Sequence, residues 1–155
     1  MSSYTIQASC ELPFEDAVAA VRAELANAGF GVITEIDLRA TLQKKIGAEI
    51  PAEVILGACN PRFAHRAITV DPSVAALLPC NVVVRSLGDR RTLVEAFDPA
   101  AMMRLATGPG NDGHGDGSGG DLEGLAAEVG QQLRTALGAV QGGPRPGGAG
   151  TTKEN

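Results

Sequence analysis

Stretches of alternating apolar residues and stretches of apolar residues at helical spacing take turns along the chain. Alternation over residues 4–10 predicts a first strand. A helix follows, and its apolar face is formed by Phe14, Val18, Val21 and Leu25. We expect Gly29 to end this helix in the left-handed conformation that glycine adopts easily. A second strand is predicted over residues 30–38, followed by a short helix with Leu42 and Ile46 on one side.

The middle of the chain carries the longest apolar run and two helix starts. Residues 54–59 have the length and composition of a buried strand. The Asn-Pro pair at 60–61 and the Asp-Pro pair at 71–72 each predict a helix start, because a capping side chain precedes a first-turn proline. Residues 80–87 alternate as a strand, and residues 92–97 predict the returning strand of a hairpin.

The last third predicts two helices separated by a glycine-rich insert. The first is short and covers residues 100–105, and the insert covers residues 107–120. We expect Asp121 to cap the second, long helix, whose apolar face is formed by Leu122, Leu125, Val129, Leu133, Ala136 and Val140. Residues 141–155 have the composition of a disordered tail. The pattern therefore predicts one domain over residues 4–140.

This order of elements predicts an α+β fold. Paired strands lie between the two long helices, which favours an antiparallel sheet with the helices packed on one face and short accessory helices beside it. Aromatic residues make up only 3% of the chain, so we expect a core of Val, Ile, Leu and Ala.

Composition also argues against several partners. The net charge is −5 and there is no basic block, which argues against binding to the phosphate backbone of a nucleic acid. Aromatic residues are scarce, which argues against binding of single-stranded nucleic acid by base stacking. No stretch reaches the roughly 20 apolar residues of a membrane span. The N-terminus lacks the pattern of a signal peptide. Three cysteines without disulfide-framework spacing predict free thiols in a reducing, cytoplasmic setting.

Several uncommon residue types recur at fixed separations in the chain. They are Gly-Phe-Gly-Val at 29–32, Glu-Ile-Asp at 35–37, Ile-Leu-Gly-Ala-Cys-Asn-Pro at 55–61, Ala-His at 64–65, Leu-Pro-Cys at 78–80 and Asp-Pro at 98–99. This set, over about residues 4–105, resembles domain-of-unknown-function family 302. The resemblance implies a two-layer α+β sandwich of β-α-β4-α type, similar to half of a TATA-binding-protein-like fold, and a homodimer. It implies no activity, and the glycine-rich insert and tail depart from the family's usual pattern.

The densest candidate chemistry lies between residues 59 and 80. Cys59 ends one predicted strand and Cys80 begins another, so antiparallel strands would bring the thiols to one sheet edge, whereas parallel strands would separate them. The helix start after Cys59 would favour its thiolate. His65, one turn into that helix, could face the same edge. The candidate ligand-binding residues are Cys59, Asn60, His65 and Cys80, for a soft metal, haem iron, or sulfur or redox chemistry.

Two alternatives stay open beside this thiol module. Free cysteines often only fill space, and the spacing matches no standard zinc motif, which favours a non-enzymatic dimeric interaction domain with structural cysteines. A third hypothesis is an acid/base enzyme that uses Glu35 and Asp37, because residues two apart on a strand share a face. Asp37 fits a helix cap equally well, and Glu35 a solvated strand residue. The sequence identifies neither a cofactor nor a reaction.

The glycine-rich insert partly fits a calcium loop. Oxygen-bearing or turn residues are needed at loop positions 1, 3, 5, 6 and 12, which here are Asp112, His114, Asp116, Gly117 and Glu123. Histidine is a poor calcium ligand, and Gly119 stands where an apolar residue is expected. A flexible linker is therefore the favoured interpretation.

Overall fold

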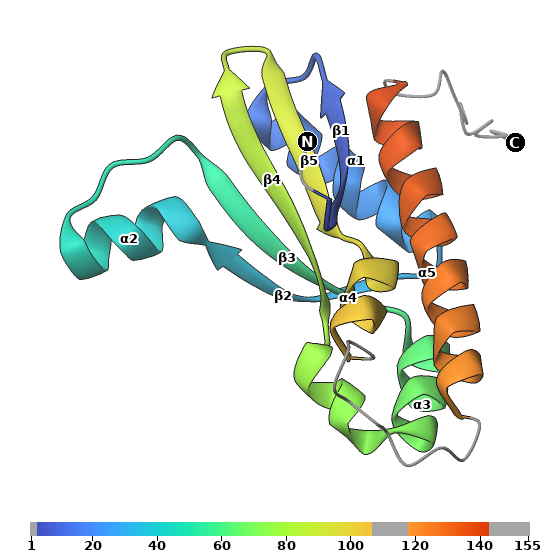
Figure 1. Ribbon diagram of the computed structural model, residues 1–155. Coiled ribbons are helices and arrows are strands. Elements are labelled where there is room, and N and C mark those ends of the chain that lie inside the picture. Colours follow the sequence, from blue (N-terminus) through green and yellow to red (C-terminus); the bar gives the residue numbers. More distant parts are fainter. Residues whose placement is uncertain (1–2, 107–117, 143–155) are drawn as a thin grey trace, which may run out of the picture.

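The computed structural model describes residues 3–106 and 118–142, and a five-stranded antiparallel sheet lies at its centre (Figure 1). The strands are β1 (Thr5–Cys10), β2 (Gly31–Asp37), β3 (Glu53–Cys59), β4 (Cys80–Gly88) and β5 (Arg91–Phe97). Their order in the sheet is β1-β5-β4-β3-β2, and every neighbouring pair is antiparallel. The predicted α+β class with an antiparallel sheet is confirmed.

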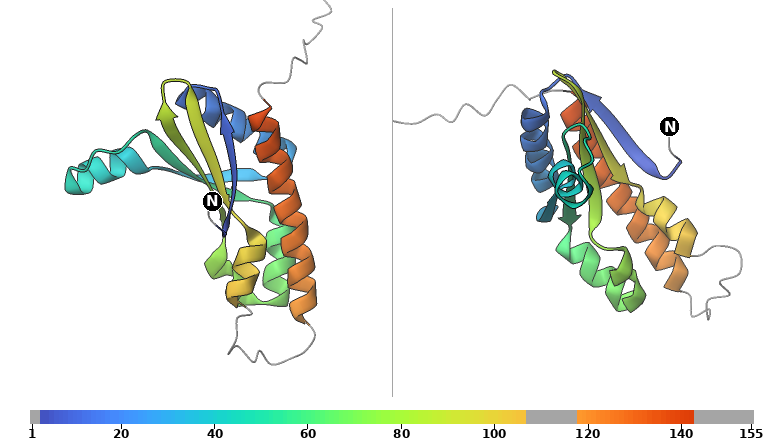
Figure 2. Two further views of the ribbon diagram at one scale, coloured as in Figure 1. Left: turned by 45° about the horizontal axis from the view of Figure 1, so that its top comes forward. Right: turned by 90° about the vertical axis from the view of Figure 1, so that its left-hand side faces the viewer.

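The helices divide into a layer on the sheet and a group at one end of it. They are α1 (Phe14–Asn27), α2 (Leu38–Ile46), α3 (Pro61–Val70), the 3-10 helix η1 (Pro72–Leu77), α4 (Pro99–Ala106) and α5 (Ser118–Gln141). Helices α1 and α5 pack on each other and on the sheet, while α3, η1 and α4 gather beside the first half of α5 (Figures 1 and 2). The result is a two-layer sandwich with accessory helices at one end.

Alternate strand residues form the core between the sheet and the helices. Val82 and Val84 of β4 and Val94 of β5 are fully buried, and they meet Leu25 of α1 and Leu133 of α5 in one apolar cluster. The apolar face predicted for the last helix is confirmed, since its residues belong to this cluster or pack against it. The core is mainly aliphatic, as the low aromatic content predicts, with Phe30 and Phe63 as its buried aromatic residues.

Helix α1 ends as its sequence predicts. Gly29 has a φ of 90°, a conformation that a residue with a side chain rarely adopts. The amide of Phe30 donates to the carbonyl of Leu25 at 2.8 Å, and that of Gly29 donates to Ala26 at 3.1 Å. This pair of bonds is a Schellman motif. It turns Phe30 into the core, where its side chain is 2% exposed.

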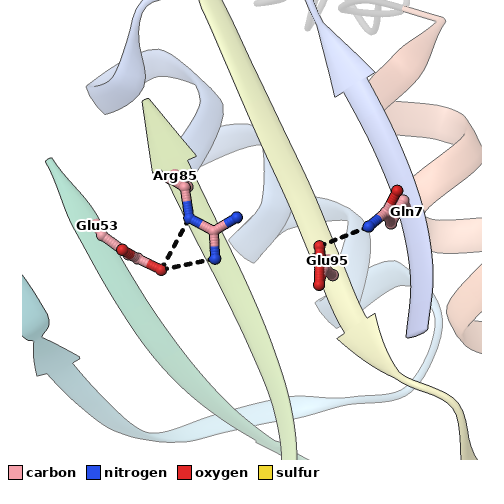
Figure 3. A network of polar contacts seen from close by, with 4 residues as sticks. All are labelled: Gln7, Glu53, Arg85 and Glu95. Atoms are coloured by element: carbon pink, nitrogen blue, oxygen red, sulfur yellow. Dashed lines mark hydrogen bonds and ion pairs between the residues drawn. The ribbon is translucent and has the colours of Figure 1, made fainter. Parts of the chain in front are cut away.

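The second face of the sheet carries polar pairs and half-buried apolar residues. Gln7 of β1 donates to Glu95 of β5 at 2.7 Å, and Arg85 of β4 binds Glu53 of β3 at 2.9 and 3.0 Å (Figure 3). The register places Ile55, Val83 and Leu93 on this same face. Side chains that the helices leave uncovered are therefore stabilised in part across the strands.

Strand β2 departs from the simple alternation predicted for residues 30–38. Val32 pairs with Ala58 and Thr34 with Gly57, so Ile33 is the extra residue of a β-bulge. Ile33 is 62% exposed. Beyond the bulge, the end of β2 and α2 form an arm that projects from the rest of the molecule (Figure 1). None of the residues of α2 is buried.

The C-terminal third of the chain departs from the prediction at the start of its long helix. Helix α5 begins at Ser118, so Asp121 lies within the helix, and the prediction that Asp121 caps it is wrong. The glycine-rich sequence before it cannot propagate a helix well, which is why the capping residue suggested a later start. Most of the predicted insert and tail, residues 107–117 and 143–155, lies outside the described residues.

Candidate functional site

The two candidate cysteines lie at adjoining strand ends. Strands β3 and β4 run antiparallel, and Ala58 is the register partner of Cys80, so Cys59 is one position beyond that pair. Both cysteines are free and only partly buried. The antiparallel arrangement that the sequence analysis required for nearby thiols is therefore present. Cys10, the third cysteine, is also free but is buried in the core on β1.

Both thiol-bearing residues line one apolar cavity at the end of the sheet. The cavity measures about 70 Å³ and lies among the ends of β3 and β4 and the helices α3, α4 and α5. Its apolar wall includes Phe30, Phe63, Val74, Leu78, Met102 and Met103. Among the described residues that line it, none carries a charged side chain, and Asn60 is the one with an amide.

The apolar surroundings determine the protonation of Cys80. Burial raises the pKa of the Cys80 thiol from 9.0 to about 11, and the nearby Cys59 adds to the rise because two negative charges repel. Cys80 is therefore a neutral thiol at pH 7. Burial likewise raises the pKa of Cys10, although a backbone hydrogen bond at Leu12 opposes the change.

Asn60 connects the cavity wall to two helices. Its Oδ1 accepts a hydrogen bond from the amide of Phe63 at 3.4 Å, which caps α3 as predicted. Its Nδ2 donates to Gln132 of α5 at 3.2 Å. Both ends of the amide thus have protein partners, so Asn60 holds α3 against α5 beside the thiols.

The structure does not bring His65 to the cysteines. His65 is exposed and lines an open groove between α3 and α5, together with Arg66, Thr69 and Glu128. Helix α3 instead turns Phe63, Ala64 and Ala67 toward the cavity. Within residues 3–106 and 118–142, no group of three or more His, Cys, Asp or Glu side chains could hold a metal ion. His65 is therefore not among the residues that line the cavity beside the two thiols.

Glu35 and Asp37 are engaged with separate partners. The register places both on one face of β2, as the sequence analysis expected. Asp37 accepts from the amide of Ala40 at 2.9 Å and caps α2, while Glu35 forms an ion pair with Arg22 of α1. Neither lines the apolar cavity. The two carboxylates thus contact different groups and not each other.

The methionines of the cavity wall were not predicted from the sequence. Met102 and Met103 lie on α4, and they are two of the three methionines of the chain. Consecutive methionines in a methionine-poor sequence were the available signal. As for the calcium hypothesis, Asp112, His114, Asp116 and Gly117 lie outside the described residues, and Glu123 is an exposed residue of α5.

Comparison with known proteins places the chain in a family. The sequence model of the domain of unknown function DUF302 matches residues 5–140, which is most of the chain. The chain belongs to the DUF302 family. A crystal structure of an uncharacterized conserved DUF302 protein from Bacillus stearothermophilus is similar to this DUF302 chain, with a TM-score of 0.75 and 22% identity. The likeness covers 88% of this chain and 98% of the other, and at this identity it shows the fold alone.

Two further observations describe this DUF302 chain. No curated protein matches it. In the part of the chain that the structure describes, every helix is too short or too polar to cross a membrane.

Proposed function

We propose that this DUF302 chain is a small cytoplasmic binding module that holds a ligand at the thiols of Cys59 and Cys80. One observation supports the proposal above all. Two free thiols from neighbouring strand ends line the same apolar cavity. A cysteine that only packs fills its space. Here the pair borders unfilled space of about 70 Å³.

The size of the cavity limits the ligand. A dry cavity of about 150 Å³ binds benzene, and sites for drug-sized molecules begin at about 300 Å³. The cavity of about 70 Å³ is smaller than either, so haem does not fit in it. A metal ion, a sulfur atom or a molecule of very few atoms fits this volume.

The state of Cys80 limits the chemistry. A nucleophilic or redox-active cysteine normally has a lowered pKa, because the thiolate is the reactive form. Burial and Cys59 raise the pKa of Cys80 to about 11 instead. A function that binds a ligand through both sulfurs therefore agrees with the site better than catalysis by a standing Cys80 thiolate.

Native mass spectrometry of the full chain purified anaerobically from its own host tests the proposal. We expect a bound adduct on the wild type that Cys59→Ala and Cys80→Ala both abolish. Cys10→Ala is the matched control, because Cys10 is a free cysteine that does not line the cavity, and it should keep the adduct. A bare chain from the host, or an adduct that survives both substitutions, would contradict the proposal.

The alternative of a homodimeric assembly domain has its own supporting observation. Helix α2 has nine residues and buries none of them, although isolated helices shorter than about 12–15 residues are marginal in water. It carries Arg39, Lys44 and Lys45 and no acid, which leaves −8 on the rest of a chain whose net charge is −5. Helix α2 is therefore a basic element of an otherwise acidic chain, which favours contact between α2 and a second copy. Dimerisation and ligand binding do not exclude each other.

A further inference from the structure

The donor atoms around the cavity select one class of ligand. Four sulfur-bearing residues line it, namely Cys59, Cys80, Met102 and Met103. We propose that Cys59 and Cys80 bind a soft monovalent metal ion, Cu(I), with thioether sulfur from Met102 and Met103 as additional donors. This inference rests on the proposed function and names the ligand class of the same site.

The chemistry of the wall separates Cu(I) from other metals. Thiolate and thioether ligands select soft ions such as Cu(I), whereas Mg²⁺ and Ca²⁺ take oxygen ligands. Among the described lining residues there is no carboxylate, and both ends of the Asn60 amide already have protein partners. Structural Zn²⁺ sites use four Cys or His ligands, but the structure places His65 in a different groove.

The volume and polarity of the cavity agree with an ion held by sulfur. A bare ion with short metal–sulfur bonds needs little of a space of about 70 Å³. The surrounding Phe63, Val74 and Leu78 side chains carry no oxygen or nitrogen ligand that would compete with sulfur for the ion. Methionines often fill irregular gaps in cores. Met102 and Met103 line the same cavity as the two thiols.

Binding of Cu(I) to the two thiols needs neither an oxidant nor a reductant. Two S–H bonds are replaced by two S–Cu bonds, two protons leave to the solvent, and copper stays Cu(I). Burial opposes a lone thiolate at Cys80, but a bound cation supplies the compensating charge and deprotonates a coordinating thiol. The neutral Cys80 thiol of the free protein is thus compatible with tight metal binding.

Anaerobic competition with the coloured Cu(I)–bicinchoninate complex tests the inference on the full chain. We expect the wild type to withdraw Cu(I) from the probe in a 1:1 ratio. Cys59→Ala and Cys80→Ala should each weaken binding at least about tenfold, since even residues that only support metal ligands contribute that much. The double variant Met102→Leu/Met103→Leu keeps the apolar volume and should weaken binding about tenfold. Cys10→Ala should bind like the wild type.

A second measurement needs no variant and therefore does not depend on variant folding. Cu(I) loading of the wild type should protect Cys59 and Cys80 from alkylation, as read by peptide mass spectrometry. No withdrawal of copper from the probe, or no protection of these two residues, would overturn the inference. If native mass spectrometry then shows a copper-free adduct that depends on Cys59 and Cys80, the proposed binding module is retained and only the assignment of copper is rejected. If the chain purified from its host carries no adduct, both proposals are rejected.

Discussion

At the scale of single residues, Cys80 shows how one side chain can both suggest and restrict a function. Its place at the start of β4 brings its thiol beside Cys59, which a sequence with antiparallel strands can predict. The apolar wall around it comes from α3, η1, α4 and α5, and no local sequence pattern predicts that these segments meet there. The raised pKa of Cys80 is therefore a property of the tertiary structure.

This pKa can be measured directly. We expect the rate of Cys80 alkylation by iodoacetamide to rise about tenfold per pH unit until pH approaches about 11, because the thiolate reacts. Cys59→Ala should move the midpoint to lower pH, since the charge of Cys59 is part of the cause. Peptide mass spectrometry across a pH series gives the rates, with Cys10→Ala as control. A midpoint near the ordinary value of 9.0 in the wild type would refute the assignment.

The same group affects stability with a defined sign. The pKa of the Cys80 thiol is higher in the folded than in the unfolded chain. The neutral thiol therefore makes its full contribution to the free energy of unfolding below about pH 9. The free energy of unfolding then falls as pH rises toward 11. Urea denaturation of the wild type should show this fall, and Cys80→Ala should show less of it.

Asp37 and Glu35 show where residue-level prediction stops. Two acids on one strand face were compatible with an acid/base pair, with a helix cap or with solvated side chains. Only the tertiary structure reveals that Arg22 of α1 pairs with Glu35, while Asp37 caps the helix that directly follows it. The local role was predictable, because a cap depends on neighbours in sequence. The long-range partner was not.

At the scale of elements, Gly57 holds three segments at close distance. A Cβ at this position would lie 2.0 Å from Oγ1 of Thr34 on β2 and 2.9 Å from the ring of Pro79 before β4. We expect Gly57→Ala to lower the free energy of unfolding by about 1–3 kcal/mol, because overpacking forces these neighbours apart. Chemical denaturation monitored by circular dichroism measures the change.

Two variants make this test specific. Gly138→Ala on α5 meets no atom within 4 Å and should be neutral or stabilising, since alanine favours a helix. Adding Thr34→Ala to Gly57→Ala removes the closest contact and should restore part of the stability. If Gly57→Ala is as stable as the wild type, the close packing of these segments is not needed.

Most elements were predictable because their causes are local. Helix α1, for example, begins after Pro13 and ends in the Schellman motif at Gly29, and both residues are visible in the sequence. The bulge at Ile33 was not, because it depends on how β2 pairs with β3. A bulge shifts the alternation by one residue, so a pattern that looks continuous in sequence changes face in the sheet.

At the scale of the whole molecule, the candidate site is assembled from distant segments. The cavity wall takes Phe30 from the end of α1, Leu78 from before β4, Met102 from α4 and Leu125 from α5. Sequence patterns predict that each segment is apolar on one side. They do not predict that these sides leave a space of about 70 Å³ between them beside two thiols. For that reason the two cysteines were predictable, but the methionines and the apolar wall beside them were not.

The projecting arm is the part of the molecule at which the proposed homodimer can be tested. Ile46 of α2 is 74% exposed, so in an isolated chain Ile46→Asp should hardly affect folding. In a homodimer that covers α2, burial of an isoleucine contributes about 1.5–3 kcal/mol, and a buried carboxylate adds a further penalty. We therefore expect the wild type to sediment as a dimer of 15.8 kDa chains, and Ile46→Asp to weaken the dimer at least about tenfold.

The matched control is Ile68→Asp, which introduces the same charge at an isoleucine of α3 that is 38% exposed and lies outside the arm. It should leave the dimer intact. Because α2 is basic and the rest of the chain has a net negative charge, added salt should weaken the wild-type dimer by screening. Sedimentation equilibrium of the three proteins at two salt concentrations measures both effects. A wild type that is monomeric at micromolar concentration, or an Ile46→Asp variant as dimeric as Ile68→Asp, would show that α2 is stable without a partner copy.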